Sequence, residues 1–150
     1  MRWLACLLVG VLGCPTLAAD RGDRAECIGG TVAGLRNTDG YLVLTLDEKL
    51  VYQSGQFQLE VPYDSVNLLE YGQKVDRRYL MAIAISPLLL LSKKRKHFLT
   101  IGYTDEQGRQ QALVFQVGKA HIRSVLASLE AKTGRKVDFQ DLEARKAGAG

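Results

Sequence analysis

Hydrophobic and polar residues alternate through the middle of the chain, and this period of two predicts short β-strands that are buried on one side. The pattern is clearest over residues 56–61, where Phe57, Leu59 and Val61 face one way and polar side chains the other. Short polar turns separate the segments, as at 37–40. Seven strands are expected, over residues 31–36, 41–46, 49–53, 56–61, 66–71, 98–104 and 110–117.

The hydrophobic period changes after the last of these strands. Ile122, Val125, Leu126 and Leu129 have the spacing of an amphipathic helix, which is predicted over residues 119–133. A glycine follows, at the position that suits a left-handed helix end. The remaining expected elements are an extended stretch over 137–139 and a short helix over 141–147.

Four strands, three further strands and one amphipathic helix follow one another over residues 31–133. This order resembles the pleckstrin-homology-like superfamily (PH-like or GRAM-like domains), whose seven-stranded antiparallel bent barrel or sandwich is capped by a C-terminal helix. The resemblance implies a mainly β fold, α+β by class, in which the helix closes one end of the barrel. It also implies binding, because such barrels often accept a peptide along a strand edge beside the capping helix.

Three phrases carry a closer resemblance to small exported bacterial proteins of unknown function. They are "PYDSVNLLEYGQK", "SKKRKHFLTIGYTD" and "LEAKTGRKV". That family has no assigned activity, so the resemblance supports the expected fold and implies no mechanism.

The first residues have the composition of an export signal. Arg2 precedes an apolar run over residues 3–14, and the small residues at 16–19 suit cleavage. A permanent spanning helix would need about 20 apolar residues. The sequence therefore predicts an exported protein of the periplasm or cell envelope. The expected organisation is a signal peptide (1–19), a linker (20–30), a barrel domain (31–139) and a C-terminal tail (140–150).

Residues 11–14, Val-Leu-Gly-Cys, resemble the bacterial lipobox, in which the cysteine is lipidated and becomes the new N-terminus. Leu12 stands where a smaller residue is usual, and Pro15 follows Cys14 directly. A lipid-anchored protein is therefore the alternative to a free periplasmic one.

Removal of the signal takes Arg2 from the 20 basic residues, which leaves 19 basic and 16 acidic residues and a net charge of +3. This charge is too small for bulk nucleic-acid binding, which requires many phosphates to be neutralised. The remaining chain of about 130 residues is long enough for one domain with its own core. Cys27 then stands alone, and such a cysteine is either buried as a small apolar residue or free to pair with another chain. We expect the buried thiol, because no basic neighbour lowers its pKa.

No catalytic constellation is recognisable in the sequence. His97 and His121 are the two histidines of the chain, and neither belongs to a metal-ligand spacing or a cofactor motif. His121 is expected on the capping helix, and the acidic pairs fall in predicted turns. We therefore expect no enzyme activity, no cofactor and no metal.

Residues 79–92 form an uncharged, mostly apolar segment that is too short to span a bilayer as a helix. It admits three interpretations. In the first, the segment packs on the barrel and the basic run after it is a solvated connector. In the second, the segment contacts a membrane, with each nearby cation contributing about 1 kcal/mol at an anionic surface; the apolar contacts would be Leu88, Leu89, Leu90 and Leu91. In the third, basic residues bind an anionic ligand; these are Arg77, Arg78, Lys93, Lys94, Arg95, Lys96 and His97.

The sequence thus predicts a non-enzymatic binding or scaffolding module. Its expected partner is an unknown protein or peptide, and nucleic acid is not expected. A peripheral contact with an anionic membrane surface and a structural homo-oligomer are the alternatives.

Overall fold

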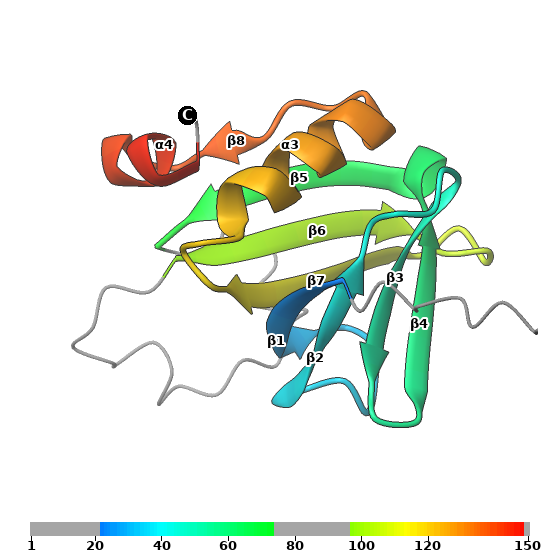
Figure 1. Cartoon of the computed structure of the whole chain (residues 1–150). Helices are drawn as coiled ribbons and strands as arrows, with labels where there is room; N and C mark the ends of the chain where they lie inside the picture. Colours follow the sequence, from blue (N-terminus) through cyan, green and yellow to red (C-terminus); the bar gives the residue numbers. More distant parts are fainter. Residues whose placement is uncertain (1–21, 74–96, 149–150) are drawn as a thin grey trace, which may run out of the picture.

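The computed structural model describes residues 22–73 and 97–148. These residues form one mixed sheet of eight strands, two helices and a short 3-10 helix (Figure 1). The strands are β1 (Asp23–Gly30), β2 (Thr38–Val43), β3 (Lys49–Ser54), β4 (Phe57–Pro62), β5 (Val66–Gly72), β6 (Phe98–Thr104), β7 (Gln110–Val117) and β8 (Asp138–Phe139). The helices are η1 (Tyr63–Ser65), α3 (Ile122–Thr133) and α4 (Leu142–Gly148).

The strand order is β4-β3-β2-β1-β7-β6-β5-β8, and all pairs are antiparallel except β5 with β8. The sheet is strongly bent, so that β2, β3 and β4 run across the direction of β5, β6 and β7 (Figure 1). The sequence predicted closure into a seven-stranded barrel. This prediction is wrong, because the eight strands form an open sheet. The three-residue helix η1 carries the chain from β4 into β5 across this bend, and the two strands are not paired.

The first strand lies earlier than expected. The alternation had placed it at 31–36, after a linker over 20–30, but β1 occupies Asp23–Gly30. A bulge between Cys27 and Gly29 interrupts the pairing of β1 with β7, which hides the period-two pattern. Residues 31–37 instead form a loop, in which Gly34 and Asn37 adopt positive φ angles of 88° and 55°.

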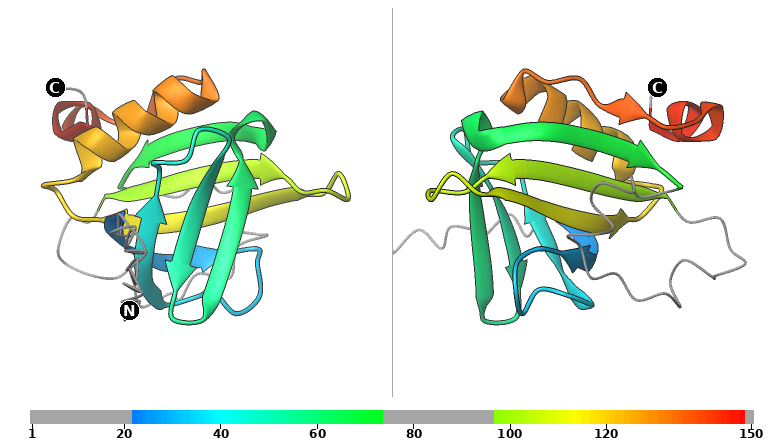
Figure 2. Two further views of the ribbon diagram at one scale, coloured as in Figure 1. Left: turned by 45° about the vertical axis from the view of Figure 1, so that its right-hand side comes forward. Right: turned by 180° about the vertical axis from the view of Figure 1, so that it is seen from behind.

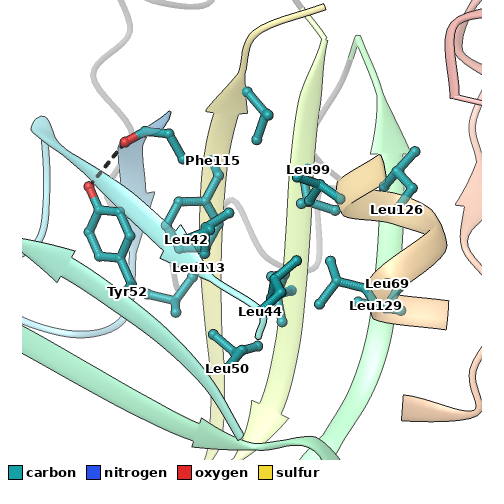
Figure 3. Packing of buried hydrophobic residues seen from close by; sticks show 14 of the residues in the cluster. Leu42, Leu44, Leu50, Tyr52, Leu69, Leu99, Leu113, Phe115, Leu126 and Leu129 are labelled. Carbon is teal, nitrogen blue, oxygen red and sulfur yellow. Dashed lines mark hydrogen bonds between the residues drawn. The ribbon is translucent and has the colours of Figure 1, made fainter. Parts of the chain in front are cut away.

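Helix α3 confirms the predicted capping helix. Its apolar residues Ile122, Val125, Leu126 and Leu129 are each at most 2% exposed and join the core of the sheet. Gly134 ends the helix in the left-handed conformation, and its N–H is bonded to the Glu130 carbonyl. Figure 3 shows Leu126 and Leu129 packed beside Leu69 and Leu99 of the sheet.

Tyr52 is the largest buried side chain at the opposite end of the core (Figure 3). Its ring packs against Phe115, with ring centroids 4.9 Å apart. Its hydroxyl donates to the Thr38 carbonyl at 2.6 Å and accepts from the Cys27 N–H at 3.3 Å. A buried polar group is tolerated when it is bonded in this way, so Tyr52 connects β3 to β1 and β2 inside the core.

The C-terminal segment, expected to be a tail beyond residue 139, packs on the domain. Strand β8 pairs with Glu70 and Tyr71 of β5, and Ala144 of α4 is fully buried. The Arg123 side chain donates to the Lys146 and Ala147 carbonyls, which fixes α4 beside α3. This segment therefore covers part of the outer edge of β5.

Candidate binding site

The structure places one of the site residues that the sequence predicted. The anionic-ligand candidates Arg77, Arg78 and 93–96, the membrane candidates 88–91 and the lipidation candidate Cys14 lie outside the described residues.

His97 is described, directly before β6. Its ring stacks on Tyr71 with centroids 5.5 Å apart, and Phe139 meets Tyr71 edge-on. The Nε2 atom of His97 is buried and has no hydrogen-bond partner within the described ranges. His97 is therefore packed against Tyr71 at the β5–β6 end of the sheet, with its Nε2 atom buried and the residue as a whole partly exposed.

The free edge of the sheet lies along β4. Within the described part of the chain, β4 pairs only with β3, through the register from Ser54↔Phe57 to Lys49↔Pro62. Gly55 has a φ of 57°, as a two-residue hairpin loop with glycine at its first position requires. An edge strand of this kind presents unpaired N–H and C=O groups.

The register shows which residues present these groups. The Tyr63 N–H donates to the Glu48 carbonyl at 3.0 Å, just beyond the last pair of the ladder. Main-chain groups in an antiparallel ladder point alternately toward and away from the partner strand. The odd-numbered residues of β4 therefore bond to β3, and the even-numbered Gln58, Glu60 and Pro62 face the free edge. Proline has no N–H to leave unpaired, so Pro62 suits its position.

A groove of about 400 Å³ runs along this edge. One wall is β4 with η1, and the other is the end of β6 with the turn into β7, which lie near one another at the right of Figure 1. We call this groove the seam. Its lining residues are Leu59, Glu60, Pro62, Ser65, Tyr103, Thr104, Asp105, Glu106 and Gln107.

The apolar part of the seam continues toward the β3–β4 turn. Phe57, Leu59 and Val61 point to the core side of β4, but their burial decreases along the strand from Val61 to Phe57. Val61 is fully buried, Leu59 is half-buried and Phe57 is 58% exposed. The Phe57 ring lies near Gly34 of the β1–β2 loop. The seam therefore offers an apolar wall to anything that lies alongside β4.

Charged groups at the seam are held in place by local bonds. Asp105 accepts from the main-chain N–H groups of Gln107 and Arg109 and from the Arg109 guanidinium. Desolvation alone would raise the pKa of this carboxyl, but the bonds from Arg109 and Gln111 together lower it. The side-chain bond from Lys49 lowers the pKa of Glu60. Both carboxyls are thus negative at neutral pH.

The second edge of the sheet differs from the first. The outer edge of β5 is partly covered by β8, and the Gln140 N–H continues the contact by donating to the Tyr71 carbonyl at 3.2 Å. The Arg135 side chain donates to the Val66 carbonyl at the other end of β5. The edge beside the capping helix, where the PH-like resemblance implies a peptide, is therefore occupied by the chain itself.

Among residues 22–73 and 97–148, the other reactive groups lie apart from one another. Burial raises the pKa of the Cys27 thiol to about 11, partly opposed by a hydrogen bond with the Gly29 main chain. His121 Nδ1 lies 3.0 Å from Asp23 at the start of α3. The described residues contain no cluster of three metal-ligating side chains. None of the helices in the described ranges has the length and apolar character to cross a bilayer.

The sequence interpretation missed the seam residues. The alternation assigns Gln58 and Glu60 to the polar face of a strand, and the acidic pair Asp105 and Glu106 falls in a predicted turn. Pro62 was the one local signal of an edge. The outer edge of β4 has no partner strand in the described part of the chain, and a turn more than 40 residues later lies opposite it. Both features depend on the bend of the whole sheet.

No protein-family model and no curated protein matches the chain.

Proposed function

We propose that this chain is a non-enzymatic binding module of the bacterial cell envelope, and that it binds an extended peptide segment in the seam by strand addition to β4. The observation that carries the proposal is the pair of residues with outward main-chain groups, Gln58 and Glu60, beside a groove of about 400 Å³. Pro62 ends this row, because it has no N–H and its carbonyl accepts from the Ser65 hydroxyl at 2.7 Å. Strand addition obtains affinity from main-chain bonds and specificity from alternate side chains.

The groove favours a peptide with a particular pattern. Side chains that point inward would lie over Leu59 and Tyr103, which are apolar except for the tyrosine hydroxyl. The rim holds the carboxyls of Glu60, Asp105 and Glu106. A residue with a long apolar stem and a cationic end, lysine or arginine, satisfies both parts. We therefore expect basic, extended peptides to bind more tightly than acidic ones.

The proposal includes a PH-like architecture. Its support is the order β4-β3-β2-β1-β7-β6-β5, with one amphipathic helix after β7. The chain departs from the seven-stranded pattern through β8 and through the open seam. Both departures affect where a peptide can bind. Strand β8 covers the edge beside the helix, whereas the outer edge of β4 stays open.

Location in the cell envelope rests on the export signal expected at residues 1–19, with Cys14 as the alternative lipid anchor. Mass spectrometry of the mature N-terminus tests this part. A start at residue 19 or 20 supports the free periplasmic form, and a diacylated Cys14 supports the anchored form.

The binding proposal is tested with a peptide display library selected on the immobilised mature chain. Gln58→Pro removes an outward N–H without touching the bonds to β3, whereas Gln58→Ala removes the same side chain and keeps the N–H. We expect Gln58→Pro to weaken selected peptides by about tenfold or more, because one main-chain bond is worth about 1 kcal/mol and the proline ring obstructs the edge. Gln58→Ala should bind within about twofold of the parent.

Equal affinities of the two variants, with circular dichroism showing both folded, would contradict strand addition at β4. Selection of no extended peptide at all would contradict the proposed function as a whole.

A further inference from the structure

A second buried surface lies on the face of the sheet that points away from the core. Ile28 of β1, Phe98 of β6, and Ala112 and Val114 of β7 are at most 4% exposed, yet none belongs to the core cluster. Thr100, next to Val114 across the β6–β7 pair, is 1% exposed. We call this set of five the outer patch.

The alternation along the strands explains why the outer patch is separate. In β7, Leu113 and Phe115 point into the core, so Ala112 and Val114 point the other way. In β6, Leu99 and Ile101 have the same relation to Thr100. A strand that is buried on both faces requires a layer on each side.

The described helices do not supply the second layer. Helices α3 and α4 contact each other, η1, β5 and β8, and both lie together at the β5 side of the sheet (Figure 2). The residues of α3 that are buried belong to the core cluster, with Ile122 and Leu129 as examples. The cover of the outer patch is therefore to be sought beyond the described elements.

We propose that residues 79–91, the uncharged segment between β5 and β6, pack on the outer patch as an intrachain layer. The chemistry of the two surfaces matches, because 79–92 is fourteen residues without a charge and the patch presents four apolar side chains and one hydroxyl. This inference is independent of peptide binding in the seam.

The segment that joins β5 to β6 also begins and ends beside the outer patch. Gly72 and Phe98 are a cross-strand pair, so the chain leaves β5 and enters β6 side by side, and Phe98 belongs to the outer patch. Twenty-three residues, 74–96, join these points. An extended arm of about eleven residues reaches about 35 Å, whereas three strands span only about 10–15 Å. The segment can cross the patch and return.

Buried polar atoms at this end of the sheet are consistent with a covering layer. Gln116 Oε1 is buried without a hydrogen-bond partner among the described residues, as is His97 Nε2. Phe98 stands opposite Gln116, since Leu99 pairs with Phe115. A buried acceptor of this kind ordinarily has a donor, and the main chain of a segment across the patch supplies one.

The natural methionine at position 81 allows a direct test. The chain has two methionines, Met1 and Met81, so replacement of methionine by its diazirine analogue places one photoreactive side chain inside 79–91. Irradiation of the dilute, folded protein should give intrachain adducts, mapped by mass spectrometry to the strands of the outer patch. These strands are Asp23–Gly30, Phe98–Thr104 and Gln110–Val117.

A matched control moves the probe by a few residues. In the double variant Met81→Leu/Lys93→Met, the photoreactive group stands in the basic run, and we expect mostly water addition. Three results would overturn the proposal: water addition from Met81 as from the control, adducts between isotopically mixed chains, or adducts with added phosphatidylethanolamine/phosphatidylglycerol vesicles in place of intrachain ones. The second result would identify another copy as the cover, and the third a membrane.

Discussion

The outward-pointing side of the sheet has two halves that differ in composition and burial. On β2, β3 and β4 it presents Tyr41, which is 41% exposed, together with the exposed polar residues Gln53 and Gln58. On β1, β7 and β6 it presents the outer patch, whose central residue Val114 is fully buried. Both halves belong to one continuous sheet.

Strands of the same sheet can therefore differ in whether their outward side chains are exposed. That exposure decides which half is available for binding. The half with β4 is half-buried in the ordinary manner of an antiparallel sheet, with a solvated face and an open edge. On the outward side of this half, Val51 is a buried apolar residue, and it pairs across the strands with the charged Glu60. Binding is expected at the open half and structural packing at the other.

The largest effect on stability is expected when an aspartate is placed in each half in turn. Val114→Asp places an unpaired charge in a fully buried position, and we expect a loss of about 4 kcal/mol or more in the free energy of unfolding. Tyr41→Asp, on the exposed half, should cost about 1 kcal/mol or less. Urea unfolding measures both, and similar losses would show that the outer patch is not covered in solution.

Substitutions on the opposite side of the sheet, which α3 covers, show how large a loss of stability to expect at a covered position. Leu129→Ala in α3 removes a fully buried side chain and should cost about 2–5 kcal/mol. Leu142→Ala in α4 is the control, because Leu142 is 75% exposed and should change stability by about 0.5 kcal/mol or less. If Leu129→Ala were as mild as the control, α3 would not be the cap of the sheet.

Much of this arrangement follows from local pattern. The four apolar residues of α3 stand at helical spacing, and five of the seven expected strands agree with β3 to β7 to within about one residue. Strand β2 (Thr38–Val43) begins inside the turn predicted at 37–40 and shares only residues 41–43 with the expected strand. Strand β1 was misplaced because its bulge at Cys27 interrupts the alternation. Strand β8 has two residues and pairs in parallel, so it carries no periodic signal and depends on contacts with β5.

The candidate site was less predictable for a physical reason. A charge run such as 93–96 is visible in any sequence, whereas an unpaired edge is a property of the whole sheet. Gln58 looks like an ordinary solvent-facing strand residue until the register shows that its main-chain groups face the edge.

The smallest expected effect concerns pH and the charges of the open half. Because the pKa of Glu60 is lowered in the folded protein, chiefly by Lys49, its contribution to stability is present above its ordinary pKa of 4.5 and lost as the pH falls through the folded value. Glu60→Gln should therefore be slightly less stable than the parent at pH 7, and the difference should shrink as the pH falls below 4.5. A difference that grew toward low pH would contradict the assigned sign.

Hydrogen exchange along β4, followed by NMR, tests the open edge most directly. The account predicts alternation in the free protein: the amides of Leu59 and Val61, bonded to β3, exchange slowly, and those of Gln58 and Glu60 exchange fast. The same two amides should become protected when a selected peptide binds. Uniform protection of all four amides in the free, monomeric protein would contradict the account, because it would mean that the edge is already paired.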